Sequence, residues 1–230
     1  MSMGSTSVRR EGQHLLLDFD ERTSPFPRLD ARRLKGAIRL EAEDAGAPLP
    51  IVLDEEGRHL WWPVAPRSRI HVDVPALGLK WQGTGYHDAN AGERPLERDF
   101  SRWTWGRFHG PNGETWISYD AHLKNGERTS QSLQLATHPS QGLSFAERVE
   151  LPLSSPTGRT GWGLDLTTRC DFGARPTVDH VLEDAPFYGR HLVTTTIRAT
   201  RAQGVTEMLD LTRFDSRWVQ GLLPFRMRKA

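Results

Sequence analysis

The period of the apolar residues is the feature that most constrains the fold of this chain. Apolar and polar residues alternate in many segments, as in Ile-Arg-Leu-Glu-Ala-Glu at 38–43. A period of two is typical of β-strands, because successive side chains point to opposite faces of the sheet. It predicts strands at 15–20, 38–43, 69–74, 102–109, 114–123, 128–136, 143–153, 162–170, 191–201 and 205–214. The chain is therefore expected to be all-β, a barrel or sandwich of ten or more strands.

Turn residues indicate how three of these strands are connected. Asn112-Gly113 and Asn125-Gly126 separate consecutive predicted strands. Asn-Gly favours a tight hairpin with a type I′ turn, since both residues tolerate positive φ. The three strands from 102 to 136 are thus expected to form an antiparallel meander. The strongest helix signal is a proline followed by apolar residues at i, i+4 and i+7 spacing, which predicts about two turns over Pro95–Trp103.

A loop-like stretch divides the chain into two expected modules. The segment 154–161 reads SSPTGRTG, which is rich in small and turn-forming residues. We take it as a linker between a first β module at 8–150 and a second, smaller one at 151–230. No internal repeat or low-complexity tract stands out.

Composition excludes several classes of function. Thirty basic residues against 29 acidic ones leave a net charge of +1, without the concentrated positive charge that nucleic-acid binding requires. The single cysteine, Cys170, excludes an internal disulfide framework. The sequence has no apolar run of about 18 residues and no secretion signal. We therefore expect an intracellular protein with no nucleic-acid partner.

Candidate functional residues gather in one part of the chain. Six of the eight tryptophans and five of the nine histidines lie between residues 59 and 122. Two pairs there, His59 with Trp61 and Tyr86 with Asp88, have the spacing that places two side chains on one face of a strand. Each pair combines a proton-handling group with an aromatic ring. The simpler alternatives are that Asp88 forms a turn and that Trp61 packs in the core.

Metal, nucleotide and serine-nucleophile chemistry lack support. Convergence of the five histidines on a metal is the alternative, but none of the ligand spacings typical of zinc sites occurs, so we expect no metal. Neither a glycine-rich phosphate loop nor a G-x-S-x-G motif is present. Trp103, Trp105 and Arg107 share one face of a predicted strand with His109, which indicates a pocket wall or a partner-binding surface.

Several segments together resemble the carotenoid 1,2-hydratase family, also called hydroxyneurosporene synthase. They are HLWWPVAP at 59–66, WQGTGYHDANAG at 81–92, PLE at 95–97, Phe100, WTWGR at 103–107, LEDAPFY at 182–188 and LPFRM at 223–227. The resemblance runs from about residue 15 to the end. It implies two lipocalin-like β modules and the hydration of the terminal C1=C2 double bond of acyclic carotenoids such as neurosporene and lycopene, with no cofactor.

The resemblance places the catalytic positions on His59, Trp61, Tyr86 and Asp88. Asp88 is expected to protonate C2, and for this it must be kept neutral by apolar surroundings. Trp61 and Tyr86 would then stabilise the tertiary cation at C1 by about 2 kcal/mol each. His59 would orient the incoming water or remove its proton. The further residues expected to contact the substrate are Trp62, Asn90, Trp103, Trp105 and Arg107.

Two other functions remain open at this point. A pericyclase or cyclase of a polyene would need a shaped pocket and no strong acid. A non-catalytic carrier would bind an apolar ligand without converting it and would tolerate changes at Asp88 and His59. Members of the family usually have an upstream segment, so we expect the first module to be truncated at its N-terminus. The hydrophobic substrate implies a cytoplasmic protein in peripheral contact with the inner membrane of a bacterium.

Overall fold

The computed structural model describes residues 2–12, 14–22, 33–43, 47, 49–138, 143–154 and 156–223. The chain divides into two compact units: unit 1 comprises Met1–Gly46 and Pro63–Ala89, and unit 2 comprises Ala47–Trp62 and Asn90–Ala230. The predicted modules, 8–150 and 151–230, divide the chain differently. Strands from both sides of residue 150 pair in one sheet of unit 2, so residue 150 lies inside that unit.

Unit 1 is an antiparallel sheet in the order β1-β2-β3-β4-β6, with β7 also paired to β6. The strands are β1 (Ser2–Met3), β2 (Thr6–Glu11), β3 (His14–Arg22), β4 (Arg33–Ala42), β6 (His59–Val74) and β7 (Leu79–Gly92), with a 3-10 turn, η1, at Pro75–Leu77. The first residues of β6 and the last of β7 belong to unit 2.

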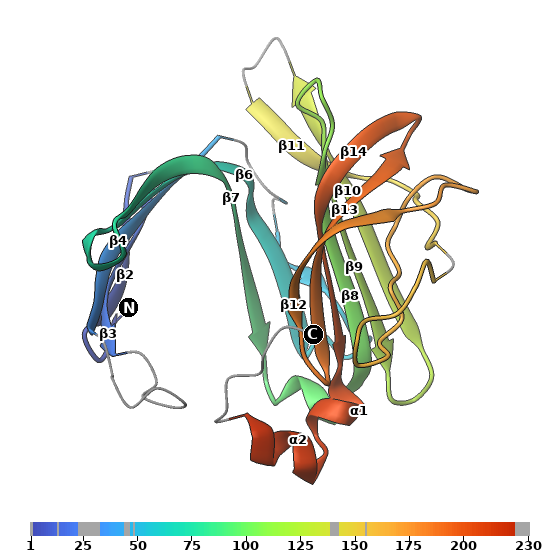
Figure 1. The fold of residues 1–230 in the computed structure, drawn as a ribbon. Coiled ribbons are helices and arrows are strands. Elements are labelled where there is room, and N and C mark those ends of the chain that lie inside the picture. The colour runs from blue at the N-terminus through green and yellow to red at the C-terminus, as the bar shows by residue number, and fades with distance from the viewer. Residues whose placement is uncertain are drawn as a thin grey trace. The chain divides into compact units, whose positions relative to one another are not determined.

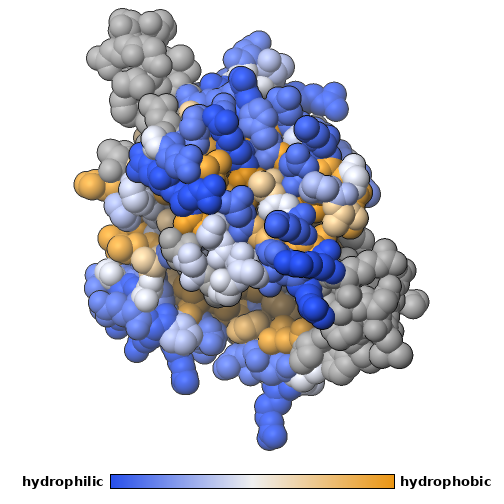
Figure 2. Space-filling model, turned by 90° about the vertical axis from the view of Figure 1, so that its left-hand side faces the viewer, coloured by the Kyte–Doolittle hydropathy of each residue, from blue (hydrophilic) through white to orange (hydrophobic). Residues whose placement is uncertain are grey.

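The alternation in the sequence gives this sheet one apolar and one polar face. Leu15 lies opposite Leu40, and Leu40 opposite Ile70, so three strands contribute to one apolar row. Most of the intervening positions hold polar or charged residues, such as Asp18, Arg39 and Arg69. Figure 2, which views the molecule from the side of β2, β3 and β4, shows mainly hydrophilic residues.

Unit 2 contains a seven-stranded antiparallel sheet in the order β11-β10-β9-β8-β14-β13-β12 (Figure 1). These strands are β8 (Phe100–His109), β9 (Thr115–Leu123), β10 (Arg128–His138), β11 (Leu143–Arg148), β12 (Thr177–Asp184), β13 (Tyr188–Ile197) and β14 (Thr200–Asp210). The unit also holds β5 (Ile51–Val52), the 3-10 turn η2 (Leu96–Arg98) and the short helices α1 (Leu211–Phe214) and α2 (Arg217–Leu222). Among the described residues, no helix has the length and apolar character needed to span a membrane.

The segment between β11 and β12 covers one face of this sheet (Figure 1). The core beneath it consists of buried residues from the strands and the segment: Phe108, Trp116, Leu151, Cys170, Val193, Ile197 and Ala202. Arg169 anchors the segment, since its Nε lies 3.0 Å from Asp120 Oδ2 and its Nη1 donates to the Leu151 carbonyl. Burial raises the pKa of the Cys170 thiol. The predicted linker at 154–161 lies in this covering segment, except for residue 155, which is outside the described residues.

The predicted all-β class and the meander from 102 to 136 are confirmed. Its two turns are not of type I′, which requires positive φ at both central residues. In each Asn-Gly turn only the glycine has positive φ, of 87° at Gly113 and 96° at Gly126. In each hairpin the glycine N–H donates to the carbonyl three residues earlier, Gly110 or Leu123, as in a type I turn followed by a left-handed glycine. A two-residue turn with positive φ occurs instead at Arg198 and Ala199, between β13 and β14.

Five predicted elements were wrong. The strand at 143–153 ends at Arg148, and the strand at 191–201 is interrupted by the turn at Arg198 and Ala199. The helix over Pro95–Trp103 is only η2, because strand pairing with β9 begins at Phe100. Segment 162–170 forms isolated bridges rather than a strand, since its polar groups bond to side chains and nearby loops. The strand at 205–214 ends at Asp210, whose Oδ1 accepts the Arg213 N–H at 2.9 Å and caps α1.

The pairing of β8 with β14 yields a stability prediction. A Cβ added at Gly204 would lie 1.9 Å from the Arg107 carbonyl oxygen and 2.6 Å from Phe108 Cα, both of them backbone atoms. We expect Gly204→Ala to lower the free energy of unfolding, measured in urea, by about 3 kcal/mol. Gly158→Ala is the control, because its Cβ would meet only the flexible Leu166 side chain at 3.7 Å. Equal stability of the two variants would contradict this packing.

Candidate functional site

Tyr86 and Asp88 lie together on β7, in unit 1. The Tyr86 hydroxyl donates to Asp88 Oδ2 at 3.2 Å, and both side chains are partly buried. A Cβ at Gly85, the residue before Tyr86, would lie 3.2 Å from Ile70 Cβ, so position 85 faces the apolar side of the sheet. Because strand residues alternate, Tyr86 and Asp88 project from the opposite face, on which the neighbouring strands carry polar residues such as Arg39, so this sheet does not itself supply the apolar surroundings expected for Asp88. The predicted pairing of a carboxyl group with a phenol is therefore present, on a strand rather than in a turn.

His59 is at the centre of a buried polar cluster in unit 2. Its side chain is 1% exposed, and its Nε2 lies 2.6 Å from Asp99 Oδ2. Arg94 Nε donates to the same oxygen at 2.7 Å, and Arg94 Nη2 donates to Oδ1. These hydrogen bonds, with those from His59 and the charge of Arg58, hold the pKa of Asp99 far below its usual range in spite of burial. Asp99 is thus an ionised acceptor, which places a proton on His59 Nε2.

The other ring nitrogen of His59 is therefore the acceptor when the ring is neutral. His59 Nδ1 is buried and has no hydrogen-bond partner among the described residues. A Cβ at Gly92 would lie only 2.8 Å from it, and the ring of Phe100 packs against the imidazole at 4.9 Å between centroids. The His59 backbone N–H donates to Asp54 Oδ1 at 3.0 Å. Asp99, Phe100 and the chain at Gly92 thus hold the imidazole in one orientation.

A row of aromatic rings crosses the sheet of unit 2 beside this cluster. Trp61, which is fully buried, lies 5.2 Å from Tyr119, measured between ring centroids. Tyr119 lies 5.8 Å from Trp103, and Trp103 lies 6.5 Å from Tyr188 in an edge-on arrangement. At the end of the row, burial and the Glu207 carboxylate raise the pKa of Tyr188, which keeps it a neutral phenol. The four rings are buried or partly buried, and they form a continuous apolar row whose π-faces attract cations.

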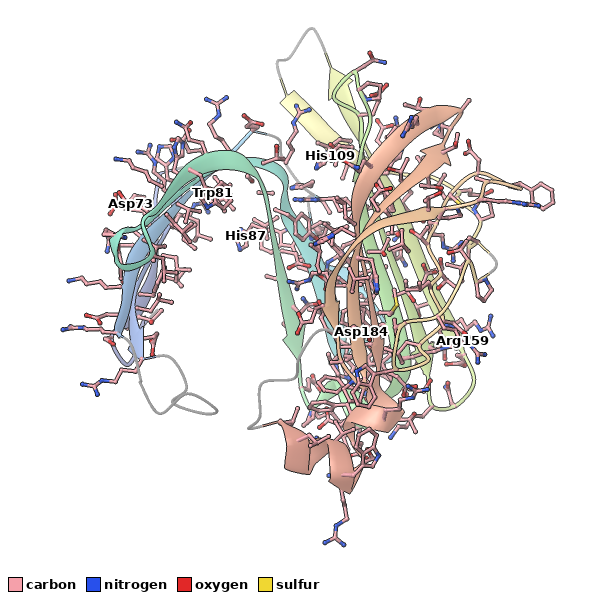
Figure 3. The ribbon with its side chains drawn as sticks, in the orientation of Figure 1. Asp73, Trp81, His87, His109, Arg159 and Asp184 are labelled. Carbon is pink, nitrogen blue, oxygen red and sulfur yellow. The ribbon has the colours of Figure 1, made fainter. Side chains whose placement is uncertain are left out.

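The remaining predicted contact residues differ in their exposure. Trp103, Trp105 and Arg107 share the face of β8 opposite to the core residue Phe108, as predicted, and His109 lies at the end of that strand (Figure 3). Trp62 is 37% exposed and its indole N–H donates to the Ala47 carbonyl at 2.7 Å, while Asn90 is exposed on β7. In the described part of the chain, no three His, Cys, Asp or Glu side chains lie close enough to hold a metal ion.

Sequence reasoning missed Asp99, Arg94, Tyr119 and Tyr188. Asp99 is 40 residues from His59, and no local pattern links the two positions. The one available signal was an acidic residue directly before the apolar strand residue Phe100, in a segment that we predicted to be helical. Tyr119 lies in the predicted strand at 114–123, and the period of two does not indicate its ring contacts.

The fold and these clusters together define an all-β protein of the lipocalin-like class with a buried polar and aromatic site. A family model described as carotenoid hydratase CrtC matches residues 1–230. The chain belongs to this carotenoid hydratase family.

Two curated relatives support the assignment, and one solved structure shares the fold. The acyclic carotenoid 1,2-hydratase of Thiocapsa roseopersicina is 37% identical over 100% of this chain and 54% of that protein. The enzyme of the same name from Rhodobacter capsulatus is 37% identical over 98% of this chain and 76% of that protein. This chain thus spans between about half and three quarters of their lengths. Kievitone hydratase from Nectria haematococca shares the fold, with a TM-score of 0.55 and 15% identity over 91% of this chain and 69% of that chain.

Proposed function

We propose that this protein adds water across the terminal C1=C2 double bond of an acyclic carotenoid such as lycopene or neurosporene. The observation that carries the proposal is the match of the carotenoid hydratase family model to residues 1–230. The curated relatives bear the name of this activity. Water is the second substrate, and the proposed mechanism uses no cofactor.

Asp88 is the proposed acid. Its carboxyl proton passes to C2, the π electrons form the new C–H bond, and a tertiary cation is left at C1. Water then adds to C1 through its oxygen and loses a proton, and Asp88 regains a proton from solvent. The hydrogen bond between Tyr86 and Asp88 supports this role, because it fixes the orientation of the carboxyl group on β7.

In unit 2, the aromatic row is the proposed surface for the polyene chain and for positive charge. Its rings are Trp61, Tyr119, Trp103 and Tyr188. A desolvated cation over such a ring is stabilised by about 2 kcal/mol. Trp105, Arg107, Trp62 and Asn90 are proposed as further contacts with the substrate.

His59 is proposed to orient the water or to take its proton. The supporting observation is the Asp99 carboxylate, which keeps the proton on Nε2 and leaves Nδ1 as the basic atom. Arg94 and Asp99 are positioning residues in this scheme, because they act through His59.

Incubation of the purified chain with lycopene in ¹⁸O-labelled water tests the proposal. We expect a product heavier than lycopene by one labelled water, detected by mass spectrometry, with the label in a tertiary hydroxyl group. In D₂O one deuterium should appear at C2. A product isomeric with the substrate would indicate a cyclase instead, and binding without conversion would indicate a carrier.

We also propose peripheral contact with the inner membrane of a bacterium, from the cytoplasmic side. The reason is the chemistry of the proposed substrate, which dissolves in lipid and not in water. Co-sedimentation of the protein with lycopene-loaded vesicles and with empty ones tests this contact.

A further inference from the structure

A pocket of about 320 Å³ lies in unit 2, and Trp103 of the aromatic row is among its lining residues. It is bounded by the ends of β8, β9, β10 and β14 and by parts of the covering segment. Its polar lining includes Arg102, Arg128, His122, Ser154 and Thr167. The volume suits a small polar ligand.

The strand register brings three of its basic side chains into one row. Arg102 on β8 lies directly opposite His122 on β9, and His122 lies directly opposite Arg128 on β10. Since neighbouring strands are about 4.8 Å apart, the two arginine Cα atoms are separated by about 10 Å. Two arginine side chains can converge on one anion across this distance. Like charges in such a row repel one another when no anion lies between them.

The effect of the two guanidinium groups on His122 is consistent with this arrangement. Burial lowers the pKa of His122, and the charges of Arg102 and Arg128 lower it further. Neither guanidinium forms an ion pair or hydrogen bond with another described residue. Their charge is therefore available to a ligand.

The acidic residues of the pocket are already paired. Asp165 accepts from Arg159 at 2.9 Å, and Arg159 lies on the covering segment (Figure 3). Asp210 caps α1 through the Arg213 N–H and also lies 3.4 Å from Arg213 Nε. Arg213 in turn donates to the carbonyls of Trp162 and Pro186. Asp165 and Asp210 are thus each paired with an arginine other than Arg102 and Arg128. The positive charges of Arg102 and Arg128 are not balanced by these two carboxylates.

We propose that this pocket binds a phosphate monoester group, held by Arg102 and Arg128 and by the hydroxyl groups of the covering segment. Guanidinium groups bind phosphate through paired, charge-assisted hydrogen bonds. The group can come from a soluble phosphate or from the headgroup of a phosphatidate lipid. The inference is independent of the hydration reaction, because none of these residues belongs to the candidate site.

The test uses binding as its readout, with two sources of phosphate. Inorganic phosphate is titrated into the protein at constant ionic strength, and the NMR signals of the His122 ring report on binding at the pocket. In parallel, phosphatidylcholine vesicles with and without phosphatidate are sedimented with the protein. The double variant Arg102→Gln/Arg128→Gln should bind phosphate at least about tenfold more weakly than the wild type. Arg175→Gln is the matched control, since Arg175 is exposed in the same unit and does not line the pocket.

Each outcome decides the proposal. A response to inorganic phosphate that the double variant loses and the control keeps supports the site with a soluble ligand. Binding confined to phosphatidate vesicles, with the same dependence on the two arginines, supports it with a lipid ligand. Equal binding by the wild type and the double variant, or no binding in either arm, overturns it. If the double variant unfolds, each single variant is tested in the same way.

Discussion

Asp88→Asn is expected to abolish hydration while leaving the fold intact. Asparagine has nearly the same shape as aspartate but has no carboxyl proton to transfer to the alkene. General acid catalysis contributes up to about 10⁴-fold, so product formation from lycopene should fall by about that factor. The side chain is only partly buried, and its hydrogen bond with Tyr86 joins two residues of the same strand, so the change in stability should be small. Liquid chromatography of carotenoid extracts measures the loss.

Asp73→Asn is the matched control for this experiment. Asp73 lies in the same unit, near the end of β6, and its side chain is 52% exposed (Figure 3). This variant makes the same chemical change away from the carboxyl–phenol pair and should keep full activity. Tyr86→Phe should lower the rate by about tenfold, because it removes the hydrogen bond that orients the carboxyl group. Full turnover by Asp88→Asn would exclude Asp88 as the acid and would favour a reaction that depends on shape alone.

Asp99→Asn is expected to affect both stability and activity. It removes a buried negative charge on which His59, Arg94 and Arg58 depend, and the loss of one partner from a buried ion pair costs about 3 kcal/mol. An asparagine can also donate to His59 Nε2, which would move the imidazole proton to Nδ1. The atom proposed to receive a proton from water would then be a donor, and the hydration rate should fall by about 10²-fold.

The pH dependence of stability separates this effect from general damage. The pKa of Asp99 is lower in the folded state than in the unfolded state, so its contribution to stability is present above about pH 4 and is lost as the pH falls. Urea unfolding of Asp99→Asn should therefore be less sensitive to acid than that of the wild type. Asp179→Asn is the control, because the pKa of Asp179 is also lowered, by hydrogen bonds from Thr194 and Gln203, but the carboxylate is on the surface. An unchanged acid limb in Asp99→Asn would refute the role of the cluster in stability.

Much of the candidate site could be read from local sequence. The period of two placed Tyr86 with Asp88, because strand geometry alone brings residues two apart to one face. It also placed Trp103 with Trp105 and Arg107. The hydrogen bond between Tyr86 and Asp88 follows from the conformation of a single strand. The shared face of Trp103, Trp105 and Arg107 follows in the same way, without a partner far away in the sequence.

The clusters that join distant segments could not be predicted in this way. The pairing of His59 with Asp99 depends on where the chain returns after β7, and the strand at Phe100 replaced a predicted helix because β9 was available as a partner. The turn at Arg198 and Ala199 has positive φ without glycine, and the carboxylate of Asp171 holds it by accepting both backbone N–H groups. Nothing in the local sequence of that turn indicates such support.

The sequence by itself determined the all-β class, the hairpins at the two Asn-Gly turns and the pairs of side chains on single strands, because these depend on the spacing of residues close together in the chain. Only the tertiary structure decided the two units, the partner of His59 and the row of aromatic rings. Those features require backbone segments far apart in the sequence to meet, and the free energy that selects such contacts comes from burial and ion pairing across the whole sheet.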